Sequence, residues 1–203
     1  MTMWNERYGS DEFYFGVEPN RFLVSHGDLL STGSVVLAIA DGEGRNGVWL
    51  AEQGCVVTSV DVASVGMAKA QCLATARRVE LTFVVADLLS WQWPTCAFDV
   101  VVAIFIQFAT PDQRREIFGR CFDALVPGGT LLLQGYREEQ LGYGTGGPPI
   151  RENLYSDGQL RSELARFDIS MLRSHDSSIH EGAGHDGMSA LADVVARRPT
   201  EAR

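Results

Sequence analysis

Lysine is nearly absent from this chain of 203 residues: among 17 basic residues, Lys69 is the single lysine and the rest are arginines. Lys69 stands in Val65–Arg78, a stretch expected to be helical, and not after a glycine-rich loop. The P-loop, which needs a lysine on phosphate, is therefore absent. No tyrosine stands four residues before Lys69, so the Tyr-x-x-x-Lys pair of single-domain dehydrogenases is absent as well.

Long apolar runs and paired cysteines are also missing. No apolar stretch reaches the roughly 20 residues of a membrane-spanning helix, and the polar, mixed-charge start at Met1–Ser10 predicts no signal peptide. The four cysteines, Cys55, Cys72, Cys96 and Cys121, form no C-x-x-C pair. This usage predicts buried, reduced thiols in a cytoplasmic protein.

The charge balance narrows the class of partner. The formal net charge of −9 repels nucleic-acid phosphates and anionic lipid heads. We therefore expect neither nucleic acid nor membrane as a partner, but a small molecule, and a cationic ligand is compatible with the charge. With 45% apolar residues, the chain fits one α/β domain over residues 1–203.

Short apolar runs alternate with amphipathic stretches along the chain. Strands and helices at this spacing predict right-handed βαβ crossovers and a parallel sheet. The last two strands, joined by a polar glycine-rich loop, are expected to pair antiparallel. The expected class is α/β, with a Rossmann-like, seven-stranded, mostly parallel sheet, helices on both faces and an antiparallel C-terminal edge strand. The expected strands are 34–40, 55–60, 81–86, 98–105, 130–134, 167–174 and 188–197, and the expected helices are 20–30, 46–53, 63–78, 112–125 and 156–166.

A glycine-rich turn follows the first expected strand. Gly42 and Gly44 lack Cβ, so they permit a tight turn and close approach of a ligand to the backbone. Asn46 stands where the next helix begins and can cap it or reach the ligand. In an open parallel sheet, ligands bind beyond the carboxyl ends of the strands. We therefore expect a ligand site at this turn.

Acidic residues stand at the ends of the next two expected strands. Asp61 follows Gly42 by 19 residues, and a carboxylate there can accept hydrogen bonds from both ribose hydroxyls. Asp87 ends the third strand on the same edge and can accept from an adenine amino group. For each aspartate alone, a turn or cap role is an equally good interpretation; a glycine-rich turn with both acids favours a nucleoside site.

Two cofactor classes fit this pattern. Gly42-x-Gly44-x-x-Gly47, with an acid about 20 residues later, matches a dinucleotide fingerprint and predicts NAD when taken alone. Three features favour S-adenosylmethionine instead: the short chain, the missing Tyr/Lys pair, and Pro127-Gly128-Gly129 before the fifth strand. An NAD-linked oxidoreductase remains the less favoured alternative.

Longer motifs carry a family resemblance. Val36–Asn46 (VLAIADGEGRN) and Val57–Asp61 (VTSVD) resemble motif I and the following acidic motif of class I S-adenosylmethionine-dependent methyltransferases. Ala124–Leu133 (ALVPGGTLLL) looks like their segment leading into the fifth strand. The EGRN turn, Gly144–Pro148 and His180–Gly187 are similar to the tellurite-resistance and thiopurine methyltransferase branch.

The resemblance implies a cofactor, S-adenosyl-L-methionine, and its contacts. Ala38 and Ala40 depart from the family pattern, which commonly has Asp and Gly there. These departures leave open a regulatory protein that binds the cofactor without turnover. The implied cofactor contacts are Ala40, Asp41, Gly42, Gly44, Asn46, Asp61, Val62, Asp87, Leu88, Ile104 and Phe105.

Methyl transfer needs a dry, closed site because proximity and fixed dipoles supply most of the catalysis. Residues 1–31 are therefore expected to form a lid and helix, and residues 136–187 the loops and helix on the acceptor side. Tyr14 is expected to contact the cofactor, since aromatic rings can cover adenine and attract the sulfonium; packing on the sheet edge is the alternative. The lid aromatics are Trp4, Tyr8, Phe13, Tyr14 and Phe15.

The acceptor side offers two candidate bases. His180 and His185 lie in one glycine-rich stretch, and histidine can take a proton from an acceptor near neutral pH. Exposure or a structural hydrogen bond is the plainer interpretation of either histidine. The acceptor is expected to be a thiol, a tellurite- or selenite-like oxyanion, or a heteroaromatic compound. No His, Cys or carboxylate set has metal-ligand spacing, so no metal is expected.

Overall fold

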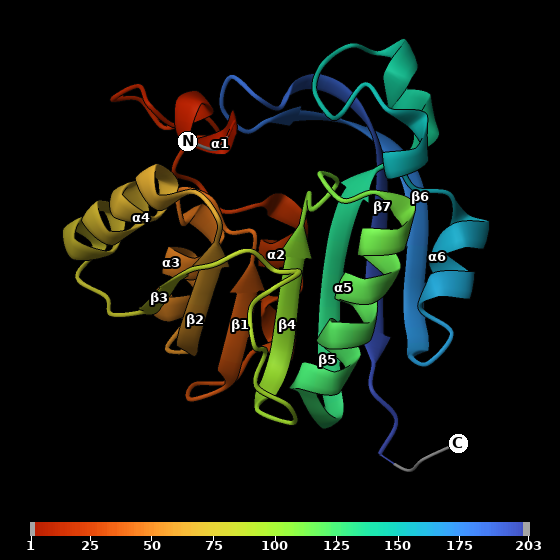
Figure 1. Ribbon diagram of the computed structural model, residues 1–203, viewed down its shortest axis with the longest axis horizontal. Coiled ribbons are helices and arrows are strands. Elements are labelled where there is room, and N and C mark those ends of the chain that lie inside the picture. Colours follow the sequence, from red (N-terminus) through yellow and green to blue (C-terminus); the bar gives the residue numbers. More distant parts are fainter. Residues whose placement is uncertain (1–2, 201–203) are drawn as a thin grey trace.

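Seven strands form one sheet in the order β3-β2-β1-β4-β5-β7-β6 in the computed structural model, which describes residues 3–200. Strands β1 to β5 are parallel, whereas β7 runs antiparallel to both β5 and β6. This is the Rossmann-like sheet expected from the sequence, including its antiparallel edge (Figure 1). The strands are β1 Val35–Ile39, β2 Val56–Asp61, β3 Thr82–Val85, β4 Phe98–Ile104, β5 Leu125–Tyr136, β6 Asp168–His180 and β7 Asp186–Arg197.

Helices cover both faces of the sheet, and each face has its own apolar core. On one face, α5 contributes Ile117 and Phe118 and α6 contributes Leu160; on the other, α2 contributes Leu23 and α3 contributes Leu50. The central strands are apolar on both sides because both sides are covered. The helices are α1 Met3–Arg7, α2 Arg21–Ser25, α3 Arg45–Glu52, α4 Ser64–Arg77, α5 Pro111–Ala124 and α6 Asp157–Glu163, with 3-10 turns η1 Gly27–Leu29, η2 Glu138–Gly142 and η3 Arg151–Asn153.

Local capping explains where several helices begin. Asn20 caps α2 by accepting a hydrogen bond from the Leu23 amide. Thr110 and Gln113 form a reciprocal capping box at the start of α5. The expected helix 20–30 is shorter than predicted, because α2 ends at Ser25 and η1 continues it as a separate 3-10 turn.

The last two strands are longer than their sequence predicts. The glycine-rich loop between these strands is Glu181–His185, here called the hairpin tip, because β6 extends to His180 and β7 begins at Asp186. Residues 174–180 are mostly polar and have no clear apolar face, so the sequence did not predict that β6 continues through them. The β6–β7 arm bends over the top of the sheet towards the N-terminal segment (Figure 1).

Strand order reverses between β1 and β4, so their connections leave in opposite directions. Ligands bind outside the carboxyl ends of strands at such a switch point. We call this edge the carboxyl edge; α1 and the hairpin tip both lie over it (Figure 1). The fold thus brings the glycine-rich turn, the N-terminal segment and the hairpin tip to one place.

The cysteine prediction is half right. Cys55 and Cys121 are buried and free, as expected. Cys72 and Cys96 are free but exposed, because Cys72 lies on the outer side of α4 and Cys96 in the turn before β4. Amphipathic helices and turns expose part of their residues, so apolar or helical surroundings alone did not ensure burial.

Candidate active site

The glycine-rich turn, Asp41–Gly44, meets the end of β2 directly. The Gly42 amide donates a hydrogen bond to Asp61 Oδ2 at 2.9 Å, and Asp61 Oδ1 accepts from the Ala63 amide at 2.7 Å. Burial raises the pKa of Asp61, although these amide hydrogen bonds act in the opposite direction. Next to it, Val62 is partly exposed. The pair that the sequence predicted, Gly42 and Asp61, therefore lies together at the carboxyl edge.

Two other residues of the turn have roles inside the protein. Asp41 points inward, where it accepts from the Ser59 hydroxyl at 2.7 Å and the Gly47 amide at 3.2 Å. Burial raises the pKa of Asp41 to about 7, against these hydrogen bonds. Gly44 has φ +84°, and an added Cβ would lie 2.5 Å from the Ala70 Cβ. Packing against α4 by itself therefore requires glycine at position 44, and the expected contact of Gly44 with the cofactor stays a prediction.

The remaining predicted cofactor residues are distributed along the same edge. Asp87 is exposed, and its carboxylate accepts from the Leu89 amide at 2.9 Å, which is the turn role that the sequence left open. Leu88 and Ile104 are buried in opposite cores. Asp87 follows Ala86, whose amide donates to the Asp61 carbonyl at 3.0 Å. Asp87 therefore lies beside Asp61, but its side chain is engaged locally.

Two non-glycine residues at this edge have left-handed backbones. Ala40, at the end of β1, has φ +48°, and Phe105, at the end of β4, has φ +55°. Such conformations cost about 1–3 kcal/mol each and cluster at functional sites. Ala40 thus stands where the backbone conformation favours glycine, the residue that the family pattern commonly has at this position.

The N-terminal segment covers the turn. The Tyr8 ring packs against the backbone of Gly42 and Gly66, so that a Cβ at Gly42 would lie 2.7 Å from the Tyr8 hydroxyl oxygen. The Tyr14 amide donates to Glu43 Oε2 at 2.8 Å. Phe15 packs against Tyr14 with ring centroids 4.9 Å apart. These contacts place the aromatic segment over the carboxyl edge, where the sequence predicted a lid.

The single lysine fastens this segment. Lys69 Nζ lies 2.5 Å from Glu43 Oε1 and donates to the backbone carbonyls of Ser10 at 3.0 Å and Glu12 at 2.6 Å. Its Nζ also lies 4.9 Å from the Phe13 ring centroid. Lys69 and Glu43 were not singled out as site residues, and no local motif marks them, because their contacts join distant parts of the chain.

The hairpin tip closes the other side of the edge. Arg45, at the start of α3, donates to Glu181 at 2.6 Å, and both side chains are buried. The Asn20 side chain donates to Glu181 at 3.1 Å and to Gln134 at 2.7 Å, while the Asn20 backbone amide donates to Asn46 Oδ1 at 2.9 Å. The predicted cofactor residue Asn46 thus belongs to a buried polar network that ties the tip to the sheet.

The structure separates the two candidate bases. His180 is exposed, and its Nδ1 lies 2.5 Å from Asp186 on the arm. His185 is buried among three aromatic rings, with centroids 4.2 Å from Phe105, 4.5 Å from Phe15 and 5.5 Å from Tyr136. Only His185 therefore reaches the covered edge; His180 lies outside it because its side chain points away on the edge strand.

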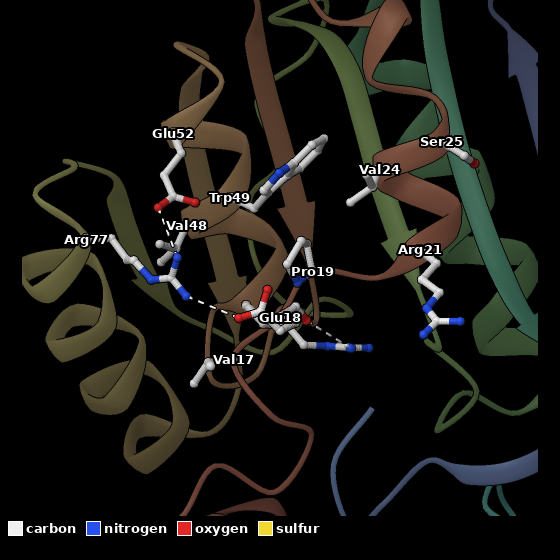
Figure 2. Close-up of a pocket in the computed structure, with 11 residues that line it drawn as sticks. Val17, Glu18, Pro19, Arg21, Val24, Ser25, Val48, Trp49, Glu52 and Arg77 are labelled. Atoms are coloured by element: carbon white, nitrogen blue, oxygen red, sulfur yellow. Dashed lines mark hydrogen bonds and ion pairs between the residues drawn. The ribbon is translucent and has the colours of Figure 1, made fainter. Parts of the chain in front are cut away.

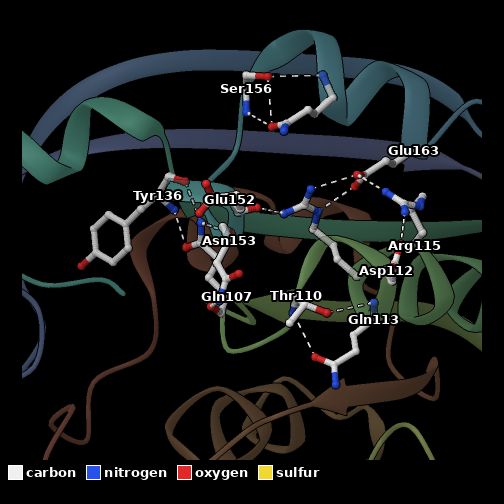
Figure 3. A network of polar contacts seen from close by, with 12 residues as sticks. Gln107, Thr110, Asp112, Gln113, Arg115, Tyr136, Glu152, Asn153, Ser156 and Glu163 are labelled. Atoms are coloured by element: carbon white, nitrogen blue, oxygen red, sulfur yellow. Dashed lines mark hydrogen bonds and ion pairs between the residues drawn. The ribbon is translucent and has the colours of Figure 1, made fainter. Parts of the chain in front are cut away.

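A second polar network holds the acceptor-side segment (Figure 3). Gln107 Nε2 donates to the Tyr136 carbonyl at 2.7 Å, and Gln107 Oε1 accepts from the Tyr136 backbone amide at 2.6 Å. Arg114 donates twice to Glu163, at 2.7 and 2.9 Å, and both side chains are buried. Gln107 thereby fixes Tyr136 beside His185, and the Arg114 pair fixes α6 against α5.

A cavity of about 660 Å³ opens on the outer side of α3. In Figure 2, Arg77 bridges Glu18 and Glu52 across its mouth, at 3.5 Å each. Arg45 is the one lining residue that also contacts the hairpin tip. This cavity is lined by Val17, Glu18, Pro19, Arg21, Val24, Ser25, Arg45, Val48, Trp49, Glu52 and Arg77, none of them a predicted cofactor contact.

Two classes of site are not found among residues 3–200. In this part of the chain, no three His, Cys, Asp or Glu side chains gather in a way that could hold a metal ion. No helix there is both long and apolar enough to cross a bilayer.

Sequence comparison identifies related proteins over the part of the chain that runs from β1 to the beginning of β5. Residues 36–129 match a family model described as a methyltransferase domain. A curated relative, the ubiquinone biosynthesis O-methyltransferase of Idiomarina loihiensis, is 33% identical over 114 residues, which are 55% of this chain and 46% of the relative. The chain spans about half the length of the first curated relatives it matches.

Solved structures share the fold at low sequence identity. A structure described for the conversion of a disulfide bond into a thioacetal group during echinomycin biosynthesis matches with a TM-score of 0.80, 18% identity, and 98% and 89% coverage of this chain and that one. A SAM-dependent methyltransferase of Methanosarcina mazei matches with a TM-score of 0.72 and 20% identity, and the match covers 91% of this chain and 100% of that one. TehB of Haemophilus influenzae matches with a TM-score of 0.71 and 16% identity, and the match covers 96% of this chain and 65% of that one. The family model and the curated relatives thus make this chain similar to methyltransferases, and the solved structures share its Rossmann-like fold.

Proposed function

We propose that this protein binds S-adenosyl-L-methionine at the carboxyl edge and transfers its methyl group to a small molecule. The hydrogen bond between the Gly42 amide and the Asp61 carboxylate carries this proposal. It places a carboxylate beside a backbone without Cβ at the switch point of the sheet, which suits a ribose. Asp61 would hold the ribose hydroxyls, with Val62 and the Asp87–Leu88 backbone beside the adenine.

The bound cofactor supplies an electrophilic methyl group, and the chain supplies position and shielding from water. Tyr14 and the neighbouring rings of the N-terminal segment cover the edge. Because Tyr8 packs directly on Gly42, entry of the adenosine requires this segment to move outward. A lid that opens for the cofactor and closes for reaction follows from this arrangement.

Binding is tested by calorimetry with S-adenosylhomocysteine. Asp61→Asn is expected to weaken binding at least tenfold, because it removes a charged acceptor worth about 1.5–3 kcal/mol. Asp99→Asn is the matched control: Asp99 also accepts a backbone amide from another strand, Val35 at 2.8 Å, but at the opposite end of β4. No heat and no thermal shift at saturating ligand, or protection by NAD instead, would refute the proposal.

We place the acceptor beside His185, with Phe15, Phe105 and Tyr136 around it, and assign His185 as the base for an acceptor that carries a proton. A thiol, a selenite- or tellurite-like oxyanion and a heteroaromatic compound are the acceptor classes. The test is release of S-adenosylhomocysteine with benzenethiol, selenite, tellurite and 8-hydroxyquinoline. Turnover of tellurite would favour the tellurite-resistance branch, and turnover of benzenethiol the thiopurine branch.

One observation favours a second function, cofactor binding without turnover. Ala40 adopts φ +48° where the backbone suits glycine, and its methyl group stands at the end of β1 beside the turn. A protein that binds S-adenosylhomocysteine but releases none from any acceptor would be a regulatory member of this fold. Methyl transfer to any compound of the panel removes this second candidate.

A further inference from the structure

Glu181 lies between a cation and the candidate base. Its Oε2 is 2.6 Å from Arg45 and 3.8 Å from His185 Nδ1. Asn20 donates to the same carboxylate at 3.1 Å. Arg45 and Asn20 therefore hold Glu181 from two directions, and its remaining neighbour is the imidazole.

The carboxylate is anionic in this setting. Burial raises the pKa of Glu181, but the His185 ring and the Arg45 charge oppose burial and bring the pKa down to about 2. A buried anion with two fixed donors has one orientation, since both hydrogen bonds are lost when it turns. The charge facing His185 is thus present at neutral pH, far above the pKa of Glu181.

His185 is held in one ring plane by its aromatic neighbours, Phe15, Phe105 and Tyr136. Its Nδ1 is buried and has no hydrogen-bond partner, and the nearest carboxylate oxygen is that of Glu181. Burial lowers the pKa of His185, so the ring is neutral near pH 7 and carries one proton on one of its two nitrogens. Glu181 is placed to decide which nitrogen carries it.

We propose that Glu181 is the positioning residue for His185: its charge, 3.8 Å from Nδ1, favours the tautomer with the proton on Nδ1, which leaves the lone pair of Nε2 to receive the proton of the methyl acceptor. This inference rests on the proposed function and deepens it. The acceptor's bond to hydrogen breaks and its proton passes to Nε2. The lone pair of the acceptor atom forms the new bond to the methyl carbon. The sulfur of S-adenosyl-L-methionine keeps the electron pair of the sulfur–methyl bond, which breaks. Glu181 then stabilises the imidazolium.

The charges that face His185 come from three elements. Glu181 attracts a proton to the ring, whereas Arg45 of α3 and Arg7 of α1 repel it. The Tyr136 hydroxyl, from β5, is neutral in the physiological range because burial raises its pKa above the usual value. Removal of the Glu181 charge leaves the two arginines unopposed, so protonation of His185 must move to lower pH.

The first test compares Glu181→Gln with Glu163→Gln, using the panel compound that turns over. Both variants break a buried carboxylate–arginine pair, but Glu163 faces Arg114 and not His185. We expect Glu181→Gln to lower kcat by about tenfold or more, in line with base catalysis. Its acidic pH limb should move to lower pH, while the Kd of S-adenosylhomocysteine stays unchanged. An unmoved acidic limb, or the same shift in Glu163→Gln, would overturn the inference.

The second test needs no variant to be active. Nitrogen-15 NMR of wild-type protein saturated with S-adenosylhomocysteine reports the tautomer of each histidine, and His185→Gln assigns the signal. We expect a protonated Nδ1 and a bare Nε2; the opposite tautomer overturns the role of Glu181. Absence of methyl transfer together with the Nδ1–H tautomer would instead refute the proposed function and leave the positioning by Glu181 intact.

Discussion

The turn half of the carboxyl edge, around Gly42 and Asp61, and the tip half, around His185, are assembled from different kinds of contact. In the turn half, a backbone amide meets a carboxylate 19 residues further along the chain. In the tip half, buried side chains meet across 136 residues, as in Arg45–Glu181, or 114 residues, as in Asn20–Gln134. The turn half therefore follows from local chain geometry, whereas the tip half exists only once the whole sheet has formed.

The largest effect is expected when Arg45, the cation that joins the turn half to the tip half, is removed. Arg45→Met leaves the buried Glu181 carboxylate without its main partner, and we expect a loss of about 3–5 kcal/mol in the free energy of unfolding. Urea denaturation measures it. Arg151→Met is the control, because the exposed pair Arg151–Glu138 contributes at most about 1 kcal/mol.

The double variant Arg45→Met/Glu181→Leu sharpens the interpretation. With both charges gone, no unpaired ion stays buried, so the double variant should be more stable than Arg45→Met alone. A double variant that is less stable than both single variants would mean that packing of these side chains, and not their charge pairing, joins the halves.

The turn half is expected to fail through packing. Gly44→Ala places a Cβ 2.5 Å from the Ala70 Cβ at φ +84°, and we expect a loss of about 2–4 kcal/mol from strain and overpacking combined. Gly33→Ala provides the matched control, with φ +86° and open space around the added Cβ, and should lose only about 1–2 kcal/mol. Equal losses in thermal unfolding would show that backbone conformation alone sets the requirement.

The turn half should also carry a pH signature. Burial raises the pKa of Asp41 from 3.8 to about 7, so between these values the folded state keeps a proton that the unfolded state has released. Folding stability from this group is therefore complete below about pH 4 and declines as pH rises to about 7, by at most about 1.4 kcal/mol per pH unit. Asp41→Asn cannot titrate, so the stability of wild type relative to this variant should fall over that window. A constant difference across the window would contradict the assignment.

The smallest expected effect is at the end of β1. Ala40→Gly removes a left-handed alanine and should stabilise the fold by about 0.4–1 kcal/mol. Arg78→Gly relieves a similar backbone, φ +60°, at the end of α4, and should stabilise equally. If the methyl group of Ala40 crowds the cofactor, only Ala40→Gly will also tighten binding of S-adenosylhomocysteine; equal affinity in both variants would show that it does not.

The sequence predicted the parts of the site that local rules determine. Apolar runs placed β1 to β5, and the EGRN turn with Asp61 and Asp87 placed the carboxyl edge. The contact of Gly44 with Ala70, a residue of the next helix, could not be predicted, because no residue of the turn itself indicates it. The hydrogen bond between Asp41 and Ser59 could likewise be known only from the parallel pairing of β1 and β2.

The tip half shows why the remaining site residues could not be predicted from the sequence. His180 and His185 stand five residues apart in one glycine-rich stretch, and nothing local distinguishes the exposed side chain from the buried one. Their separation depends on where β6 ends and on three aromatic rings supplied by distant segments. Glu181, Asn20 and Lys69 are single polar residues whose partners are found only in the folded chain. Catalytic and cofactor roles for the individual site residues stay predictions until the variants are measured.

The β6–β7 arm has a consequence for how such a protein can diversify. Its two strands are joined by an antiparallel ladder that runs from Asp168–Arg197 at one end to His180–Asp186 at the other, with one irregularity between Ile169 and Met171. The five residues between the strands cannot vary alone, because a Cβ on Gly182 would lie 2.5 Å from the backbone of Gly16 and Tyr14, and one on Gly184 would lie 2.3 Å from the Phe15 ring. The hairpin tip and the N-terminal segment must therefore change together, so this scaffold can reshape this end of the sheet only through paired substitutions in segments near opposite ends of the chain.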